Sequence, residues 1–172
     1  MLLPITAILN ASPTILLAKA GVIQLIPKLF TSVVIPKEVH DEIIRKPEEE
    51  LIIINQLIYK KQITITKKPT TLLDQMVSER LGVGELAVIS LSLKVMSGQK
   101  REVLAILDDK PARNLATLLG VKVLGTLGVL VLAKKRDLLD SQSALESLNR
   151  LMNFGGFFDP FLIEKTKLEL KS

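Results

Sequence analysis

The stretch "AILDDKPARNLATLLGVKVLGT", residues 105–126, contains the end of a strand, a helix and a second strand in that order. An apolar run leads into the adjacent aspartates Asp108 and Asp109, Pro111 begins an amphipathic run, and Gly120 ends it. Parallel strands need a crossover connection of this kind, so the stretch predicts a βαβ unit. Two neighbouring carboxylates repel each other unless something cationic shares them. The pair therefore raises the question of what it binds.

Strand and helix patterns alternate along the rest of the chain. Short apolar or β-branched runs predict strands at residues 1–9, 31–36 and 62–68, and amphipathic or apolar runs between them predict helices. Ser12 is expected to cap the first helix, and Thr126 is expected to cap the helix that follows it. We predict an α/β protein, a three-layer α/β/α sandwich with a small, mostly parallel central sheet over residues 1–140. Residues 141–172 are expected to form a C-terminal helical extension that packs on the domain or on a partner.

The composition excludes several kinds of site. The 172 residues include no cysteine and one histidine, His40, which excludes thiolate metal sites, disulfides, cysteine nucleophiles and polyhistidine metal sites. Any metal ion must therefore bind to oxygen ligands, which favours Mg²⁺ or Mn²⁺. The formal net charge of +5 suits an anionic partner such as nucleic acid, and ordinary solubility explains it equally well. No signal peptide or membrane span is evident, so we expect a cytoplasmic protein without membrane contact.

Five polar residues follow strands or begin helices where a ligand site would form. In an open α/β sheet, ligands bind at the carboxyl ends of the strands. Asn10 follows the first strand, Asp108 and Asp109 follow a later one, Glu42 lies on the helix after the second strand, and Glu85 begins the most apolar helix. Each has an ordinary explanation as a turn residue, a helix cap, part of a solvated face or a partner of its own helix N-terminus.

Taken together, these residues favour a metal site. Acids after separate strands, in a chain without cysteine, suggest that several carboxylates converge on a divalent ion. Such an ion can align phosphates, activate water and neutralise a leaving oxyanion. The sequence therefore suggests phosphate chemistry.

Four blocks of the sequence carry a family resemblance: "NASPTILLAKAGVIQLIPKLF" (10–30), "VVIPKEVHDEI" (33–43), "LGVGELAVISLS" (81–92) and "AILDDKPARNLATLLGVKVLGTLGVLVLAKK" (105–135). Together they resemble the PIN-like domains over about residues 5–140. More closely, they resemble the branch described as predicted nucleic-acid-binding PIN proteins of toxin–antitoxin type.

The resemblance implies a metal-dependent ribonuclease whose site gathers about four acids. The first acid falls on Asn10, which departs from the general PIN pattern because it has an amide. The second falls on Glu42, the third on Glu85, and the fourth on Asp108 or Asp109, between which the spacing does not decide. The metal, together with Lys110 and Arg113, is then expected to offset the repulsion within the aspartate pair.

The function implied is that of an Mg²⁺- or Mn²⁺-dependent endoribonuclease that cleaves RNA as the toxin of a toxin–antitoxin pair, with a small antitoxin protein as partner. The alternative is a catalytically weak or inactive PIN-like module that binds nucleic acid or a partner protein. Asn10 is the feature that separates these two readings.

The C-terminal segment suggests a further contact. Phe157, Phe158, Phe161 and Leu162 lie close together in the sequence, and exposed apolar patches of this kind mark interfaces. We expect a homodimer or a partner contact there. The alternative is that this segment packs back on its own domain.

Overall fold

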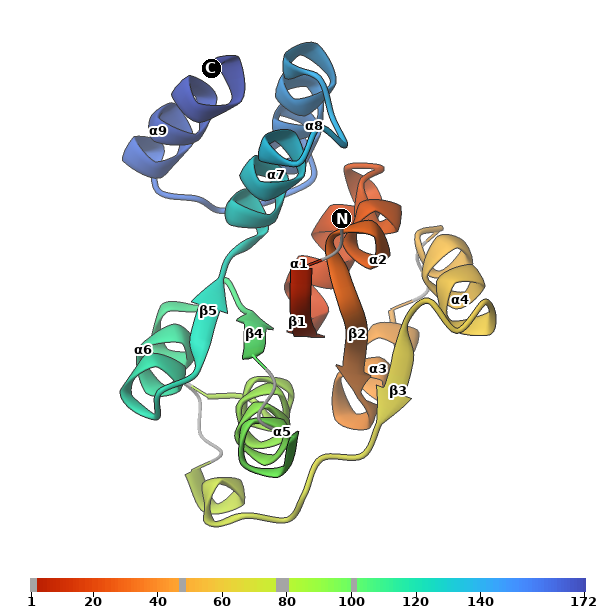
Figure 1. Ribbon diagram of the computed structural model, residues 1–172, viewed down its shortest axis with the longest axis vertical. Helices are drawn as coiled ribbons and strands as arrows, with labels where there is room; N and C mark the ends of the chain where they lie inside the picture. Colours follow the sequence, from red (N-terminus) through yellow and green to blue (C-terminus); the bar gives the residue numbers. More distant parts are fainter. Residues whose placement is uncertain (1–2, 47–48, 77–80, 100–101) are drawn as a thin grey trace.

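The computed structural model describes residues 3–46, 49–76, 81–99 and 102–172. Within this part of the chain, five strands form one sheet in the order β3-β2-β1-β4-β5, and every neighbouring pair is parallel (Figure 1). The strands are β1 (Leu3–Leu9), β2 (Phe30–Pro36), β3 (Thr64–Thr66), β4 (Glu102–Ile106) and β5 (Lys122–Leu124). The predicted α/β class and parallel sheet are confirmed.

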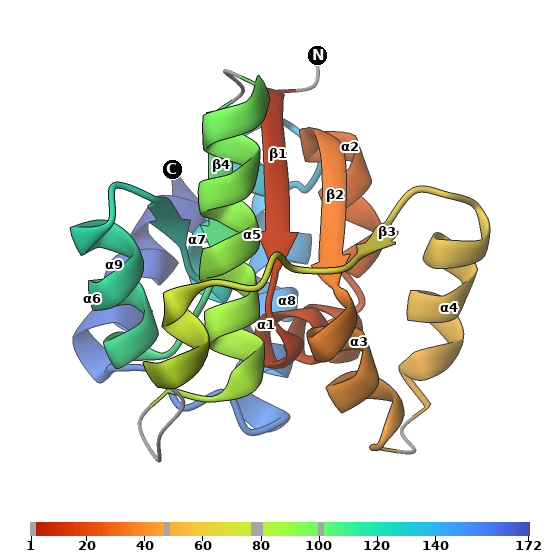
Figure 2. The ribbon, with the colours of Figure 1, turned by 90° about the horizontal axis from the view of Figure 1, so that it is seen from below.

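Helices cover both faces of this sheet, which completes the three-layer sandwich (Figure 2). One face carries α1 (Ala11–Lys19), α7 (Thr126–Lys135) and α8 (Ser141–Asn153), which contact one another; the other carries α3 (Lys37–Ile44), α5 (Val83–Gln99) and α6 (Lys110–Leu118). The remaining helical elements are η1 (Ile23–Leu25), α2 (Ile26–Leu29), α4 (Leu51–Tyr59), η2 (Leu72–Met76) and α9 (Pro160–Lys171). No helix among the described residues is long and apolar enough to cross a membrane.

The core lies on both sides of the central strand. Ala7, Ile8 and Leu9 of β1 are completely buried, as expected for a parallel sheet that is covered on both faces. Every residue of α5 from Leu86 to Ser92 is buried as well. This burial explains why α5 is apolar on nearly every side. A hydrogen bond between Asn10, directly after β1, and Glu85 places the first turn of α5 beside the carboxyl end of that strand.

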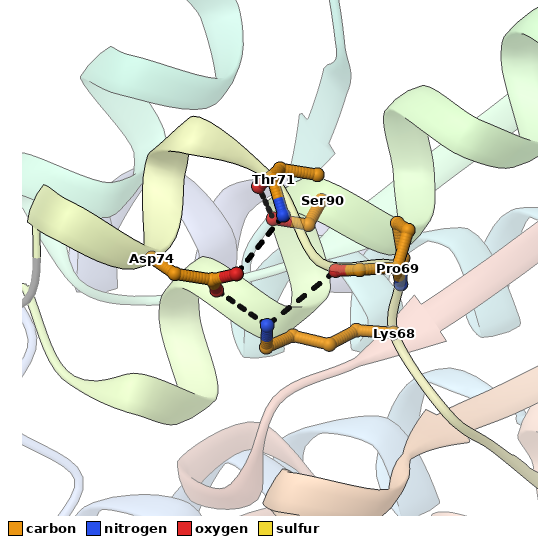
Figure 3. Close-up of polar contacts among 5 residues, drawn as sticks. All are labelled: Lys68, Pro69, Thr71, Asp74 and Ser90. Carbon is orange, nitrogen blue, oxygen red and sulfur yellow. Dashed lines mark hydrogen bonds and ion pairs between the residues drawn. The ribbon is translucent and has the colours of Figure 1, made fainter.

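The segment between β3 and η2 is tied to α5 by polar contacts (Figure 3). Lys68 forms an ion pair with Asp74 and also donates to the carbonyl of Pro69. The Thr71 backbone N–H donates to Asp74 Oδ2 at 2.9 Å, and the Thr71 hydroxyl lies 3.2 Å from the Ser90 hydroxyl of α5. The hydrogen bond from Lys68 holds the pKa of Asp74 below its usual value. This polar cluster fixes the segment that precedes α5 to the body of that helix.

Two expected helix caps differ from those observed. Asn10, rather than Ser12, is the N-cap of α1, and Gly125, rather than Thr126, is the N-cap of α7. The helix α1 begins two residues earlier than expected because β1 runs directly into it. The Asn10 side chain makes no capping bond, and Pro13 has no N–H to offer it. Its amide is therefore available for a contact outside its own helix.

The aromatic residues of the C-terminal segment differ in burial. Phe158 packs against the core, whereas Phe157 and Phe161 are 101% and 79% exposed. Helix α9 packs on α7 and α8 rather than on the sheet. Phe158 therefore packs back on its own domain, as the alternative prediction expects. The predicted interface, which involves the exposed Phe157 and Phe161, remains a prediction.

Candidate active site

Asn10 lies at the point where β1 ends, and its side chain turns toward α5. Its backbone N–H donates to the carbonyl of Ile106 in β4 at 3.1 Å, and the residue is 3% exposed. The amide Nδ2 donates to Glu85 Oε1 at 3.0 Å. This contact assigns the orientation of the amide, because the opposite orientation would place Oδ1 against a carboxylate oxygen. Asn10 Oδ1 is consequently buried and has no hydrogen-bond partner among the described residues.

Gly84 shows that Glu42 belongs to the same site. A Cβ atom at position 84 would lie 3.0 Å from Glu42 Oε2 and 3.1 Å from Asn10 Oδ1. Both oxygens thus face the backbone of the first turn of α5, so close that a methyl group at position 84 would require them to shift by a few tenths of an ångström. Glycine is needed here for close approach, since its φ angle is ordinary. Glu42 is also 46% exposed at its side chain and lies 3.9 Å from Lys46 Nζ.

The site therefore combines one amide and two carboxylates from three elements: Asn10 at the end of β1, Glu42 on α3 and Glu85 in the first turn of α5. Sequence reasoning missed Gly84, although the signal was present. A glycine directly before an acid in the first turn of a buried helix leaves room for neighbouring side chains to approach.

The adjacent aspartates bind to the N-termini of two different helices. Asp108 Oδ1 accepts a hydrogen bond from the Thr126 backbone N–H at 2.7 Å, and Asp108 Oδ2 accepts one from the Thr126 hydroxyl at 2.6 Å. Asp109 is the N-cap of α6 and accepts from the Ala112 N–H at 2.9 Å. Helix N-termini favour negative charge, so each carboxylate is stabilised by its own set of donors. These donors offset the cost of two neighbouring charges.

The expected role of Lys110 and Arg113 in offsetting the aspartate charges stays a prediction. Neither forms an ion pair with Asp108 or Asp109 within 4 Å in the described residues. Arg113 instead donates through Nη1 to the Leu107 carbonyl at 2.8 Å. It thereby holds the end of β4 against the start of α6.

Asp108 and Asp109 lie at the same edge of the sheet as Asn10, but they do not contact the residues that Asn10 contacts. Asp108 lies two residues beyond Ile106, which bonds to the Asn10 backbone. No contact among the described residues joins either aspartate to Asn10, Glu42 or Glu85. In the same part of the chain, no three Asp, Glu, His or Cys side chains gather closely enough to hold an ion. The structure thus brings together three of the five residues expected from the sequence.

The comparison with protein-family models agrees with this fold. A family model described as a PIN domain matches residues 6–172, so the chain belongs to the PIN domain family. The match includes the two C-terminal helices, and the expected boundary at residue 140 remains a prediction. A search of curated proteins finds no match. The PIN domain is a nuclease-type fold, generally depends on divalent metal ions and suggests nucleic-acid binding.

The observed side chains fit a hard divalent cation by their chemistry. The donors are all oxygens, which Mg²⁺ and Mn²⁺ prefer. Asn10 Oδ1 is a buried acceptor without a donor in the part of the chain that the structure describes, and such an atom costs free energy unless a donor or a cation compensates it. The two carboxylates supply the charge, and water would complete the coordination of Mg²⁺.

Proposed function

We propose that this protein is a divalent-metal-dependent endoribonuclease of the PIN type. Asn10, Glu42 and Glu85 would hold Mg²⁺ or Mn²⁺ at the carboxyl edge of the sheet. The observation that supports this proposal most directly is the buried Asn10 Oδ1, which has no hydrogen-bond partner among the described residues and faces the same turn of α5 as Glu42 Oε2. The substrate class is RNA, as the family and the net charge of +5 favour.

The protein's own groups have distinct tasks in this proposal. The Asn10 amide orients the Glu85 carboxylate by donating to Oε1 and leaves Oε2 for other contacts. Glu42 is half-exposed, so its carboxylate lies between the buried part of the site and the solvent. A bound divalent ion supplies Lewis-acid chemistry for phosphodiester hydrolysis. As the fourth acid we favour Asp109, because it uses only Oδ2 in its cap, whereas Asp108 uses both oxygens.

Cleavage of a labelled single-stranded RNA tests the proposal. We expect cleavage with Mg²⁺ or Mn²⁺, none with a chelator, and at least a tenfold loss in Glu85→Gln. Glu146→Gln is the matched control, since Glu146 is an exposed residue of α8 that contacts only Gln142 in the described residues. Equal cleavage by Glu85→Gln and the control would refute the site, and cleavage that survives the chelator would refute the metal dependence.

A second candidate is a PIN-like module that binds nucleic acid or a partner protein without cleaving it. Two observations favour it: an amide occupies the position of the first acid, and the Asp108 carboxylate is fully engaged with Thr126. Asn10→Asp separates the two candidates. A gain of cleavage supports the nuclease, whereas RNA binding without cleavage in both proteins supports the binding module.

The toxin assignment and the small antitoxin partner are supported by the sequence resemblance. Induced expression in a bacterial host should arrest growth, and Glu85→Gln should remove the arrest. Co-expression of the adjacent reading frame should restore growth if that frame encodes the partner. Normal growth despite cleavage-active protein would argue against a toxin while leaving the nuclease proposal intact.

A further inference from the structure

A large groove lies between helix α9 and the strands β4 and β5. Helix α9 packs on α7 and α8 (Figure 1), and the groove beside it has a volume of about 780 Å³. Its lining is mostly apolar and includes Ile5, Leu104 and Leu124 of the sheet, Val131 of α7 and Leu162 of α9. Pockets that bind small organic ligands have volumes of about 300–1,000 Å³ and are likewise mostly apolar. The groove therefore has the size and the lining of a ligand site.

The groove is elongated along the direction of the strands. Ile5 lies at one end, since it pairs with Glu102 at the start of β4, and Lys110 lies at the other, beyond the end of β4. Helix α7 lines the groove from its N-cap, Gly125, to its last residue, Lys135. A helix of 10 residues is about 15 Å long. The groove thus suits an extended chain rather than a compact molecule.

The acidic side chains in the lining already have donors within the chain. Both oxygens of Asp108 accept hydrogen bonds from Thr126, and Asp159 caps α9. Glu169 forms an ion pair with Lys135. These carboxylates therefore present satisfied rather than free negative charges to the groove.

The basic side chains at the groove have donors to spare. Lys110 and Lys165 line it, are exposed and form no ion pair within 4 Å among the described residues. Arg113 also lines it and gives Nη1 to the Leu107 carbonyl. Lys110 and Arg113 are three residues apart on α6, so they lie on the same side of that helix. The groove consequently ends at a pair of cations that suits an anionic group.

We propose that this groove binds a long-chain fatty acid. Its carboxylate would lie between Lys110 and Arg113, and its hydrocarbon chain would lie along Leu104, Leu124 and Val131. The long stem of a lysine packs on apolar surface while its ammonium group reaches a polar partner, which fits the place of Lys110 at the end of the groove. The site uses none of the three residues proposed for the metal, so the inference goes beyond RNA cleavage and does not depend on it.

The apolar middle of the groove favours a hydrocarbon chain over a peptide. An extended peptide laid on Leu104, Leu124 and Val131 would bury backbone N–H and C=O groups without partners, which costs free energy. A hydrocarbon chain has no such groups and gains from the removal of apolar surface from water. Phe157, which lines the groove and is 101% exposed, would cover part of the bound chain.

Fluorescence titration with cis-parinarate, a fatty acid that fluoresces when it is shielded from water, tests this proposal. The chain has no tryptophan, so its own emission interferes little. We expect saturation at one molecule per chain, displacement by oleate, weaker displacement by oleyl alcohol and none by acetate. Binding without saturation, or equal displacement by the alcohol and by oleate, would overturn the proposal and leave the groove to another class of ligand.

Two variants test the two ends of the contact. Lys110→Glu should weaken parinarate binding about tenfold, through loss of a charge-assisted hydrogen bond, while an acid in the first turn of α6 suits that helix. Lys94→Glu, at an exposed position of α5 outside the groove, is its control. Leu162→Asp should weaken binding as well, whereas Leu168→Asp, on the exposed side of the same helix, should not. Equal binding by the variants and their controls would contradict this site.

A fluorescent label shows where the fatty acid binds. The chain has no cysteine, so a single cysteine can be introduced and labelled cleanly. A bimane label on Asn114→Cys, at an exposed position that lines the groove, should change its emission when oleate is added. The same label on Tyr59→Cys, an exposed position of α4 outside the groove, should not. A response at Tyr59→Cys alone, or at neither position, would place the binding elsewhere and overturn the proposal.

Discussion

At the residue scale, Asn10 has two roles that conflict when its amide is changed to an acid. The uncharged Asn10 amide donates a hydrogen bond from Nδ2 to Glu85 Oε1 at 3.0 Å. An aspartate at position 10 would instead place a second negative charge beside the Glu85 carboxylate. We expect Asn10→Asp to lower the free energy of unfolding by about 1–3 kcal/mol in a chelator, since it replaces a hydrogen bond to a charged group by repulsion. Urea unfolding measures this change.

Manganese should reverse that loss. The added carboxylate strengthens binding of a divalent ion, so Asn10→Asp should gain more stability from Mn²⁺ than the unaltered chain does. The same titration on Asn114→Asp, an exposed change with the same chemistry, is the control. If Mn²⁺ stabilised all three proteins equally, Asn10 would not belong to a metal site.

Gly84 provides a second prediction at this scale. Gly84→Ala places a methyl group 3.0–3.1 Å from Glu42 and Asn10, so these side chains must move apart. We expect a stability loss of about 1–3 kcal/mol from overpacking and weaker Mn²⁺ binding by calorimetry. Gly98→Ala in the same helix is the matched control, because nothing lies within 4 Å of its added methyl group. Alanine there should be neutral or stabilising, and equal effects at both positions would contradict the close-approach role.

At the element scale, the aspartate pair joins two helices to the end of β4. Asp108→Ala removes both bonds to Thr126, which is itself completely buried. We expect the free energy of unfolding to fall by about 1–3 kcal/mol, because buried donors are left unsatisfied.

Asp109→Asn should change the free energy of unfolding little, since asparagine caps helices as well as aspartate does. Both are measured by urea unfolding in a chelator. An unchanged stability of Asp108→Ala combined with lost Mn²⁺ binding would make Asp108 a ligand instead.

The segment before α5 gives a pH-dependent prediction. The folded pKa of Asp74 is lowered by Lys68, so the ion pair stabilises the fold above the unfolded pKa of aspartate. That stabilisation is lost as the pH falls through the folded pKa. Asp74→Asn should therefore melt below the unaltered chain at neutral pH, and the difference should shrink on acidification. Thermal unfolding at several pH values measures it, and a difference independent of pH would exclude the ion pair as its cause.

At the scale of the whole molecule, the C-terminal helices complete the core. Leu148, Leu151 and Leu170 are completely buried, and α8 packs on α1 and α7. Each such leucine is worth about 1.5–3 kcal/mol, and their sum is comparable with the ~5–15 kcal/mol that stabilises a whole domain. We expect a chain ending at residue 140 to lack a cooperative thermal transition by circular dichroism. A two-state transition in that fragment would show that residues 1–140 fold independently.

The sequence alone determined the layers of this protein. Alternation of apolar strands with amphipathic helices predicts parallel strands and their crossovers, because both patterns arise from local periodicity and from the need to bury one face. The absence of cysteine and the single histidine likewise determined which metal chemistry is possible. Asn10 and Glu85 could be selected because one follows a strand and the other begins a helix, and Glu42 because it lies on the helix that follows the second strand.

Only the tertiary structure decided how the polar side chains at that edge are used. Asp108 and Asp109 are neighbours in sequence, yet one binds Thr126 of α7 and the other caps α6. Glu42 and Asn10 meet because Gly84 lets α5 approach them. These pairings join residues up to 75 positions apart, and a carboxylate binds whichever donor the packing of the helices places nearest. Local periodicity carries no information about that distance, so the sequence could name the acids but not their partners.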